Sequence, residues 1–370
     1  MRVLILTYPL TAVTDDACGG AEQIALLLLR GLSRIPEFEL FWIAAPGSAA
    51  MPGVRFATWP AVLKCAGLLQ PLPSVLPQHA LDDLQRRCQQ AALAWLAENP
   101  VELVHNQGGF FYGASPCPVL FTLHLARPLY PPDLLGMPYH FQCVSHTQQL
   151  EYGGGFALIP NGIDLGQFSP RARAASAGAP LLYLGRICPE KGPHLAIAAA
   201  RRAGRSLVIA GAVAPFPSHQ EYFRRYIEPQ LDAQIRWIPP PGARAKRELL
   251  AACAAVIVPS QIAETSSLVA MEAAAVGVPT LATRRGALPE IVIEGETGWL
   301  ADTPEEFAAA VARLDAIAPA ACRLLAERAF DARPMVAAYA RLYRQLGQPA
   351  APARAWRSPR DGVNGAPVAR

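Results

Sequence analysis

Short apolar runs alternate with helix-length segments along the chain, and this alternation begins twice. Residues 2–8 form the first apolar run, and a glycine-containing loop and an apolar helical segment at residues 21–32 follow it. A second series starts with an apolar run at residues 180–184 and a helical segment at residues 194–203. Strands that alternate with helices build parallel α/β sheets. The pattern therefore predicts an α/β protein with two doubly wound, Rossmann-like domains.

A turn-rich segment between the two series marks the expected domain boundary. Residues 160–164 read Pro-Asn-Gly-Ile-Asp, and a stretch of Ala, Arg and Gly extends as far as residue 179. Such composition is typical of an interdomain linker. The last residues are rich in Pro, Ala, Arg and Gly, and we expect them to be disordered. The chain divides into a first domain, a second domain, a C-terminal helix and a tail, at residues 1–169, 170–333, 334–348 and 349–370.

The most informative pattern lies between residues 254 and 290. A short apolar strand is followed by a polar loop that carries Glu264, and then by a helical segment at residues 268–276 that is apolar on every side. Glu272 is the single charge in that segment. Because a buried carboxylate is costly unless it is paired or hydrogen-bonded, Glu272 must have a partner.

Glu264 and Glu272 flank the N-terminus of this predicted helix, where Ser266, Ser267 and Leu268 begin the first turn. The free N–H groups of a first turn bind anions. A carboxylate on each side of a phosphate site suits a ligand with phosphate in its middle and hydroxyls at both ends, such as a nucleotide sugar. The spacing equally allows a capped core helix whose one Glu reaches solvent or a neighbouring Arg.

Further candidates for phosphate binding lie in loops between strands and helices. Arg186 and Lys191 follow the strand at residues 180–184, and two cations there complement a diphosphate. A surface pair is the alternative. Gly19 and Gly20 precede the first helix, but they lack the full G-x-G-x-x-G spacing, so they either admit a phosphate or simply make a turn.

Two histidines end strands of the first series. His105 and His124 follow apolar runs at residues 103–105 and 119–122. Because the carboxyl ends of parallel strands face the ligand crevice, both are candidate site residues. A single histidine in such a place is nevertheless more often structural.

Composition narrows the classes of function. Hydrophobic residues make up 52% of the chain, enough for two cores, and the apolar runs are too short or interrupted to span a bilayer. The tail holds a net +3 of the formal +4, so the remainder is close to neutral, which argues against nucleic-acid binding. The tail leaves room for weak contact with an anionic membrane. No signal peptide is visible, and we expect a cytoplasmic protein with reduced thiols.

Neither a metal nor another cofactor is expected. The eight cysteines are scattered, and no Cys/His cluster has metal-ligand spacing. No Asp-x-Asp motif is present to hold a divalent cation on a diphosphate. Arg186 and Lys191 would supply that positive charge instead.

The chain resembles glycosyltransferase family 4, the retaining nucleotide-sugar transferases of GT-B fold. The resemblance extends over residues 2–346 and is nearest to bacterial glucosyltransferases of small natural products and pterins. It rests on six motifs in the family's order: GGAE at 19–22, LVH at 103–105, TLH at 122–124, PNGID at 160–164, LGRICPEKG at 184–192, and two Glu eight residues apart at 264 and 272.

The resemblance implies a role for each candidate residue. Gly19 and Gly20 would contact the donor diphosphate from the first domain, and Arg186 and Lys191 from the second. Glu264 would hold hydroxyls of the transferred sugar, and His124 would lie beside its reacting face. The remaining donor contacts would be the backbone N–H groups of Ser266, Ser267 and Leu268 and, at the ribose hydroxyls, the carboxylate of Glu272. The last helix would cross back onto the first domain.

Two departures from the family pattern concern specificity. Ser266-Ser267 stands where the family usually has Phe-Gly, so the added hydroxyls alter which sugar fits. Asn106-Gln107 stands where acidic or His residues are common, which leaves the acceptor undefined. The oligomeric state is likewise undefined by the sequence.

The expected function is retaining, metal-independent transfer of a hexosyl group, such as glucose, from a nucleoside diphosphate sugar, UDP foremost, to an acceptor hydroxyl. The catalytic set would be His124, Glu264, Arg186 and Lys191. One alternative is a nucleotide-sugar-binding protein without activity. A less favoured one is a glycoside hydrolase that uses Glu264 and Glu272 as acid and nucleophile.

Overall fold

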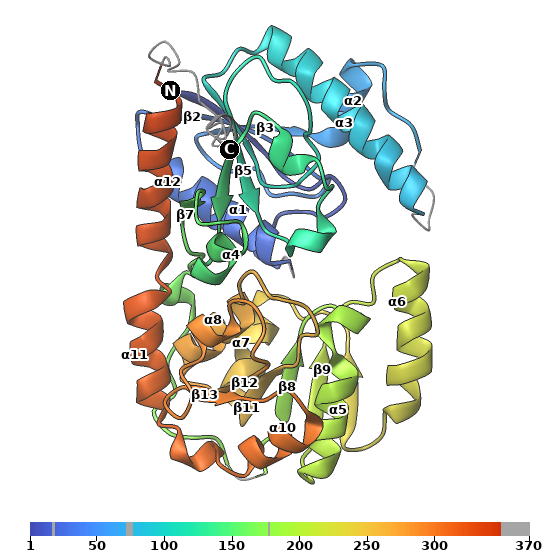
Figure 1. The fold of residues 1–370 in the computed structure, drawn as a ribbon, viewed down its shortest axis with the longest axis vertical. Coiled ribbons are helices and arrows are strands. Elements are labelled where there is room, and N and C mark those ends of the chain that lie inside the picture. The colour runs from blue at the N-terminus through green and yellow to red at the C-terminus, as the bar shows by residue number, and fades with distance from the viewer. Residues whose placement is uncertain (17–18, 72–76, 177, 349–370) are drawn as a thin grey trace, which may run out of the picture.

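Two α/β domains form the computed structural model, which describes residues 1–16, 19–71, 77–176 and 178–348. They lie one above the other in Figure 1, with the N-terminal domain at the top. The predicted tail at residues 349–370 lies outside the described residues. None of the helices in the described part of the chain is long and apolar enough to cross a membrane.

Both sheets are parallel and follow the same winding. The first has seven strands in the order β3-β2-β1-β4-β5-β6-β7, and the second has six in the order β10-β9-β8-β11-β12-β13. In each sheet the order reverses beside the first strand of the series, which is the pattern of doubly wound Rossmann-like domains. The predicted fold class is confirmed.

The central strands are short apolar segments buried on both faces, as parallel strands between helices are, whereas the edge strands β3, β7 and β10 are partly exposed. Those of the first sheet are β1 (Arg2–Leu6), β2 (Glu39–Ala44), β3 (Val54–Thr58), β4 (Leu103–Asn106), β5 (Val119–Leu123), β6 (His140–Cys143) and β7 (Ala157–Leu158). Those of the second are β8 (Leu181–Leu184), β9 (Leu207–Ala210), β10 (Ile235–Ile238), β11 (Ala255–Val258), β12 (Thr280–Ala282) and β13 (Gly298–Leu300).

Helices connect the strands and cover the sheets. They are α1 (Gly20–Leu32), α2 (Trp59–Cys65), α3 (Gln78–Glu98), α4 (His146–Glu151), α5 (Pro193–Arg202), α6 (Pro217–Tyr222), α7 (Ala243–Ala252), α8 (Leu268–Val276), α9 (Leu288–Ile291), α10 (Pro304–Val311), α11 (Pro319–Ala329) and α12 (Ala332–Leu346). Short 3₁₀ turns are η1 (Arg127–Leu129), η2 (Leu134–Gly136), η3 (Leu165–Gln167), η4 (Pro189–Lys191), η6 (Glu228–Gln230) and η7 (Leu314–Ala316), and η5 (Phe223–Ile227) is a π-helical turn.

The chain passes between the domains twice, and the two passages run side by side. Ile163 N–H donates to Phe330 O at 2.7 Å, and Ala332 N–H donates to Ile163 O at 3.0 Å. Gly162 is required there, because a Cβ at this position would lie 2.7 Å from the Cα of Ala332. After this point α12 runs along the first domain, whereas α11 lies along the second (Figure 1).

Helix α12 attaches to the first domain through buried tyrosines. Tyr343 OH is hydrogen-bonded to His105 Nδ1, and Tyr339 OH donates to Gln142 Oε1 at 2.7 Å. Thr122 Oγ1 lies 2.8 Å from the other ring nitrogen of His105. His105 is therefore fully enclosed, and burial holds its pKa well below the ordinary value. The interpretation of His105 as a crevice residue is wrong, because its side chain faces the helix that covers the sheet.

Candidate active site

The first turns of two helices from opposite domains face each other between the sheets. Helix α1 follows β1 and helix α8 follows β11, and each begins where the strand order of its sheet reverses. A Cβ added to Gly20 would lie 3.6 Å from Leu268 Cδ1, so the two N-termini are in close approach. Ligands of doubly wound domains bind at such positions. Predicted residues from both domains therefore meet at one interdomain site.

Glu264 lies in the loop before α8 and is held by a lysine. Lys191 Nζ donates to both carboxylate oxygens, at 2.6 and 2.7 Å, and Ser260 Oγ donates to one of them. The residue is only 8% exposed. Gly286 fixes the loop backbone: it has φ +58°, and a Cβ there would lie 2.2 Å from Glu264 O. The structure thus joins two predicted site residues from different motifs.

The start of α8 presents the predicted serine pair. Ser267 is the N-cap, and its Oγ accepts from Ala270 N–H at 3.4 Å. Ser266 Oγ is enclosed and has no hydrogen-bond partner among the described residues. The N–H groups of the first turn lack carbonyl partners within the helix, as in every α-helix. One serine therefore serves the helix, while the other offers a hydroxyl with unused hydrogen-bonding capacity.

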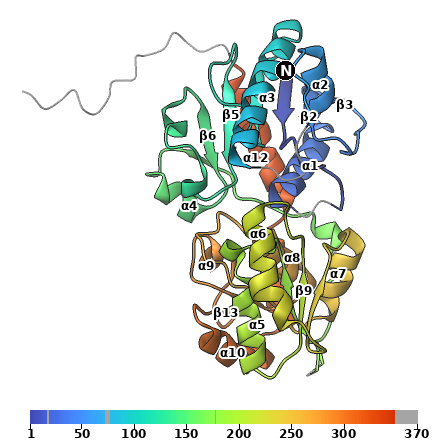
Figure 2. The same cartoon turned by 90° about the vertical axis from the view of Figure 1, so that its right-hand side faces the viewer.

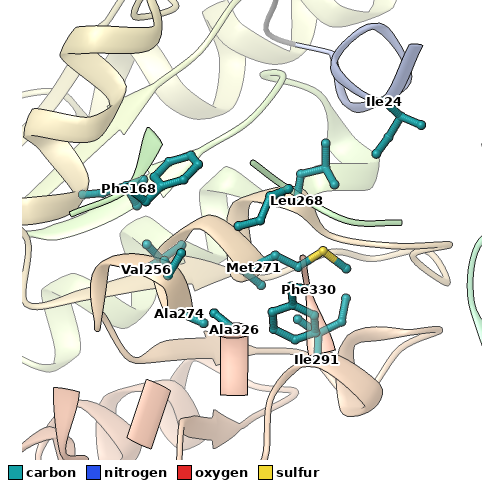
Figure 3. Close-up of a cluster of buried hydrophobic side chains, with 14 of the residues drawn as sticks. Ile24, Phe168, Val256, Leu268, Met271, Ala274, Ile291, Ala326 and Phe330 are labelled. Atoms are coloured by element: carbon teal, nitrogen blue, oxygen red, sulfur yellow. The ribbon is translucent and has the colours of Figure 1, made fainter. Parts of the chain in front are cut away.

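Helix α8 itself is embedded in the core. Leu268 and Met271 lie among Ile24 of α1, Phe168 and Phe330 in one apolar cluster (Figure 3). This packing fixes the helix axis and hence the direction of its N-terminal N–H groups.

Glu272 is paired with a lysine that the sequence did not indicate. It is 2% exposed, and Lys246 Nζ of α7 lies 2.5 Å from Oε1. Burial raises the pKa of the Glu272 carboxyl, whereas the charge and hydrogen bond of Lys246 lower it. Both side chains line a cavity of about 40 Å³ that Asp15 and Arg30 of the first domain also line. The need for a partner was predictable, but the identity of Lys246 was not.

Arg186 is half exposed and lies near enough to the first domain to affect a carboxyl group there. Its side chain is 47% exposed and lies 3.9 Å from Glu190. In the first domain, burial raises the pKa of Glu22, and the charge of Arg186 opposes that shift. The Glu22 carboxylate folds over Gly19, where a Cβ would lie 1.8 Å from Oε2. A side chain at position 19 would displace the Glu22 carboxylate from the α1 N-terminus, and sequence reasoning did not single out Glu22.

His124 contributes to the site through its ring and its carbonyl. Its Nε2 is hydrogen-bonded to Gln107 Oε1, and its carbonyl oxygen accepts from Thr265 Oγ1 of the other domain at 2.8 Å. Burial lowers the pKa of His124 to about 4, so the ring is neutral near pH 7. Gln107 also contacts His105 Nε2 at 3.1 Å, which connects the site to α12. Gln107 belongs to the Asn106-Gln107 pair that departs from the family pattern, whereas Thr265 was not predicted as a site residue; the structure places both beside His124.

Solved structures with the same two-domain architecture cover almost the whole chain. AviGT4, described as a glycosyltransferase involved in avilamycin A biosynthesis, is 25% identical with a TM-score of 0.66, over 95% of this chain and 99% of that one. Sucrose-phosphate synthase from Thermosynechococcus elongatus is 20% identical with a TM-score of 0.73, over 94% and 99%. Anabaena HepE, solved with UDP and glucose, is 18% identical with a TM-score of 0.67, over 94% and 100%.

The chain has the GT-B fold. Within it, residues 172–320 match the family model described as "Glycosyl transferases group 1". This GT-B segment contains Arg186, Lys191, Glu264 and Glu272, so the family match falls on the second domain and its half of the site.

Curated relatives match a part of the GT-B chain. D-inositol 3-phosphate glycosyltransferase of Corynebacterium efficiens is 34% identical over 167 residues, 40% of this chain and 39% of that protein. The protein with the same description from Corynebacterium glutamicum is 35% identical over 182 residues, 43% of each. The chain thus matches about two fifths of the length of these relatives.

Proposed function

We propose that this GT-B protein transfers a hexosyl group, glucose or a similar sugar, from a nucleoside diphosphate sugar to an acceptor hydroxyl with retention of configuration. The observation that carries the proposal is the line formed by Glu264, the N-terminus of α8 and Glu272, with a lysine on each carboxylate. An anion binds at a helix N-terminus, and hydroxyls bind to carboxylates on both sides. A nucleotide sugar matches that order of groups.

The donor would lie with its diphosphate between α8 and α1. Arg186, which is half exposed, and Lys191 would stabilise the charge that develops on the leaving phosphate. Those two cations supply the positive charge for which other transferases use a divalent metal, so we propose a metal-independent reaction. UDP is the first candidate nucleotide, because HepE of the same fold was solved with UDP-glucose.

The transferred sugar would lie beside Glu264 and His124. Since His124 is neutral, it acts there as a hydrogen-bonding group and not as a cation. Its carbonyl oxygen, which now accepts from Thr265, can face the developing oxocarbenium ion when that hydroxyl turns to the sugar. The leaving phosphate oxygen would then take the proton of the acceptor hydroxyl, as the retained configuration requires a base on the same face.

The contacts of the two carboxylates speak against a glycoside hydrolase. Such an enzyme needs one carboxyl group to donate a proton and the other to attack or activate water. Glu264 accepts from Lys191 and Ser260, and Glu272 is enclosed and bonded to Lys246. Neither is placed as a proton donor in open solvent.

Donor binding is tested by thermal shift and calorimetry with UDP-, GDP-, ADP- and dTDP-glucose, in EDTA and then with added Mg²⁺. A ligand at one hundred times its Kd stabilises the folded state by about 2.7 kcal/mol, so one nucleotide sugar should raise the melting temperature clearly. Glu272→Ala should abolish that rise. Glu248→Ala, on the exposed side of α7, is the matched control and should keep it. Stabilisation by none of the four donors would refute the donor assignment.

Turnover is tested with the best donor and a panel of hydroxyl acceptors. The Arg186→Ala, Lys191→Ala double variant should lower kcat by at least about 10²-fold, because both cations would stabilise the leaving diphosphate. Arg244→Ala on the exposed surface of α7 should leave it unchanged. Full turnover by the double variant would overturn the mechanism, and an inverted anomeric product would overturn the retaining assignment.

A further inference from the structure

A cysteine, a glutamate and a histidine from two separate segments lie close together beside Arg186, one of the two cations proposed to bind the donor diphosphate. Cys188 caps the η4 turn, Glu190 lies within that turn, and His219 lies on α6. One ligand atom from each lies within 4.8 Å of the other two. Helix α6 stands beside α5 on the second domain (Figure 2), so the cluster depends on tertiary packing and has no spacing motif.

The histidine in this cluster has a nitrogen without a hydrogen-bond partner. His219 Nδ1 is enclosed, and none of the residues described by the structure bonds to it. The side chain is 12% exposed, and its Nε2 lies 3.8 Å from Glu190 Oε1. A neutral imidazole ring has a lone pair on one of its two nitrogens. An enclosed nitrogen of this kind is costly unless a ligand or ion binds it.

The thiol and the carboxylate complete a set of mixed donors. Cys188 is buried, and its thiol makes a weak hydrogen bond of 3.8 Å to Arg186 O and lies within hydrogen-bonding reach of the Glu190 carboxylate. Glu190 is 27% exposed and lies 3.9 Å from Arg186. We propose that Cys188, Glu190 and His219 bind a divalent transition-metal ion of the zinc class, at a site distinct from the donor diphosphate cradle.

The identity of the three donors selects this class of metal. Thiolate sulfur, imidazole nitrogen and carboxylate oxygen are zinc ligands, whereas Mg²⁺ and Ca²⁺ prefer oxygen alone. Three protein ligands leave a fourth tetrahedral position for water or another small ligand. Metal–ligand bonds of about 2.0–2.3 Å would bring the three atoms around one ion, and His219 Nε2 already lies 3.8 Å from Glu190 Oε1.

Binding would exchange the thiol proton for the metal. The Cys188 S–H bond breaks, the sulfur lone pair forms the S–metal bond, and the proton goes to solvent. Glu190 would then bind the metal and no longer lie beside Arg186. Arg186 is proposed to bind the donor diphosphate, so metal binding would also alter donor binding. The metal site itself does not depend on the proposed transferase activity.

The test is an anaerobic titration of the reduced, chelator-treated full chain with Co²⁺, which substitutes spectroscopically for zinc. One equivalent should give a sulfur-to-cobalt charge-transfer band and intense tetrahedral d–d bands, and one equivalent of Zn²⁺ should bleach both. Millimolar Mg²⁺ should not. Cys188→Ser should abolish the charge-transfer band, and His219→Gln and Glu190→Gln should each weaken Co²⁺ binding at least about tenfold.

Cys253→Ser is the matched control, because Cys253 is also buried and its thiol pKa is likewise raised to about 12 by burial. It should leave the bands unchanged. If Cys188→Ser does not fold, the His219 and Glu190 variants decide, since both side chains are partly exposed. The absence of a charge-transfer band, or a band that survives all three site variants, would overturn the proposal. Sugar nucleotides are not needed for this readout, so its failure is separate from that of the transferase function.

Discussion

Glu264 and Glu272 are two buried glutamates on either side of the α8 N-terminus. Each is paired with a lysine, but their surroundings differ. Each is bonded to one lysine, Glu264 to Lys191 and Glu272 to Lys246. Glu264 lies in a loop, and Ser260 gives it a further hydrogen bond. Glu272 lies inside an apolar helix, and Lys246 is its only side-chain partner among the described contacts. The comparison teaches that Glu264 keeps a hydrogen-bond donor when it loses its lysine, whereas Glu272 depends on a single cation.

The largest expected effect comes from removing that single cation. Lys246→Met should lower the free energy of unfolding by about 3–5 kcal/mol, because it leaves a buried carboxylate without its partner. Urea denaturation measures the loss. The double variant Lys246→Met, Glu272→Leu should recover most of it, since an apolar pair of similar volume replaces the ion pair. Equal stability of the Lys246→Met variant and the unaltered chain would show that Glu272 does not depend on Lys246.

The pH dependence of the Lys246→Met variant sharpens the same point. The folded-state pKa of Glu272 is raised by burial above its unfolded value. A raised carboxyl pKa means that the folded state binds the proton more tightly, so the penalty is present above the folded pKa and is relieved as pH falls through it. The variant should regain stability relative to the unaltered chain by up to about 1.4 kcal/mol per pH unit as pH falls from the folded-state pKa of Glu272 towards its unfolded-state value. If the variant and the unaltered chain differ by the same free energy of unfolding at every pH, this prediction is wrong.

A smaller loss of stability is expected at Glu264. Lys191→Met should cost about 1–3 kcal/mol, because Glu264 keeps the hydrogen bond from Ser260 and lies nearer to solvent. Donor affinity, measured by calorimetry, should fall more than stability does. A stability loss as large as that of Lys246→Met would show that the two settings are equivalent.

The smallest effect is expected from removing the Ser260 hydroxyl, which donates a hydrogen bond to Glu264 but not to Glu272. Ser260→Ala removes one hydrogen-bond donor to Glu264 and should cost about 1 kcal/mol. In the background of Lys191→Met the same change should cost more, because Glu264 would then lose its last side-chain donor. A double-mutant cycle by urea denaturation measures this coupling. Simple additivity of the two changes would show that Ser260 and Lys191 act independently.

The sequence supplied the architecture because strand and helix periods are local. It also indicated Arg186, Lys191 and Glu264, which lie in loops after strands, and Glu272, which is the single charge in an apolar helix. It did not indicate Lys246, because this side chain reaches Glu272 only through the packing of α7 beside α8. It named Gln107 as a departure from the family pattern, but not its hydrogen bond to His124. The prediction for His105 was wrong for a related reason. Side chains of a strand alternate between the two faces of the sheet, and His105 lies on the face that α12 covers. Its partner Tyr343 comes 238 residues later in the chain.

The attachment of α12 to the first domain has a consequence for biosynthesis. The ring of His105 is hydrogen-bonded to Tyr343, and the carbonyl oxygen of the Gln142 side chain accepts from Tyr339. Until the ribosome has released that helix, the first sheet exposes an apolar face that contains unsatisfied polar groups. The N-terminal domain therefore cannot complete its folding during translation ahead of the C-terminal domain. A nascent chain that stalls within the second domain would be a substrate for chaperones, and its first domain should remain sensitive to protease until α12 emerges.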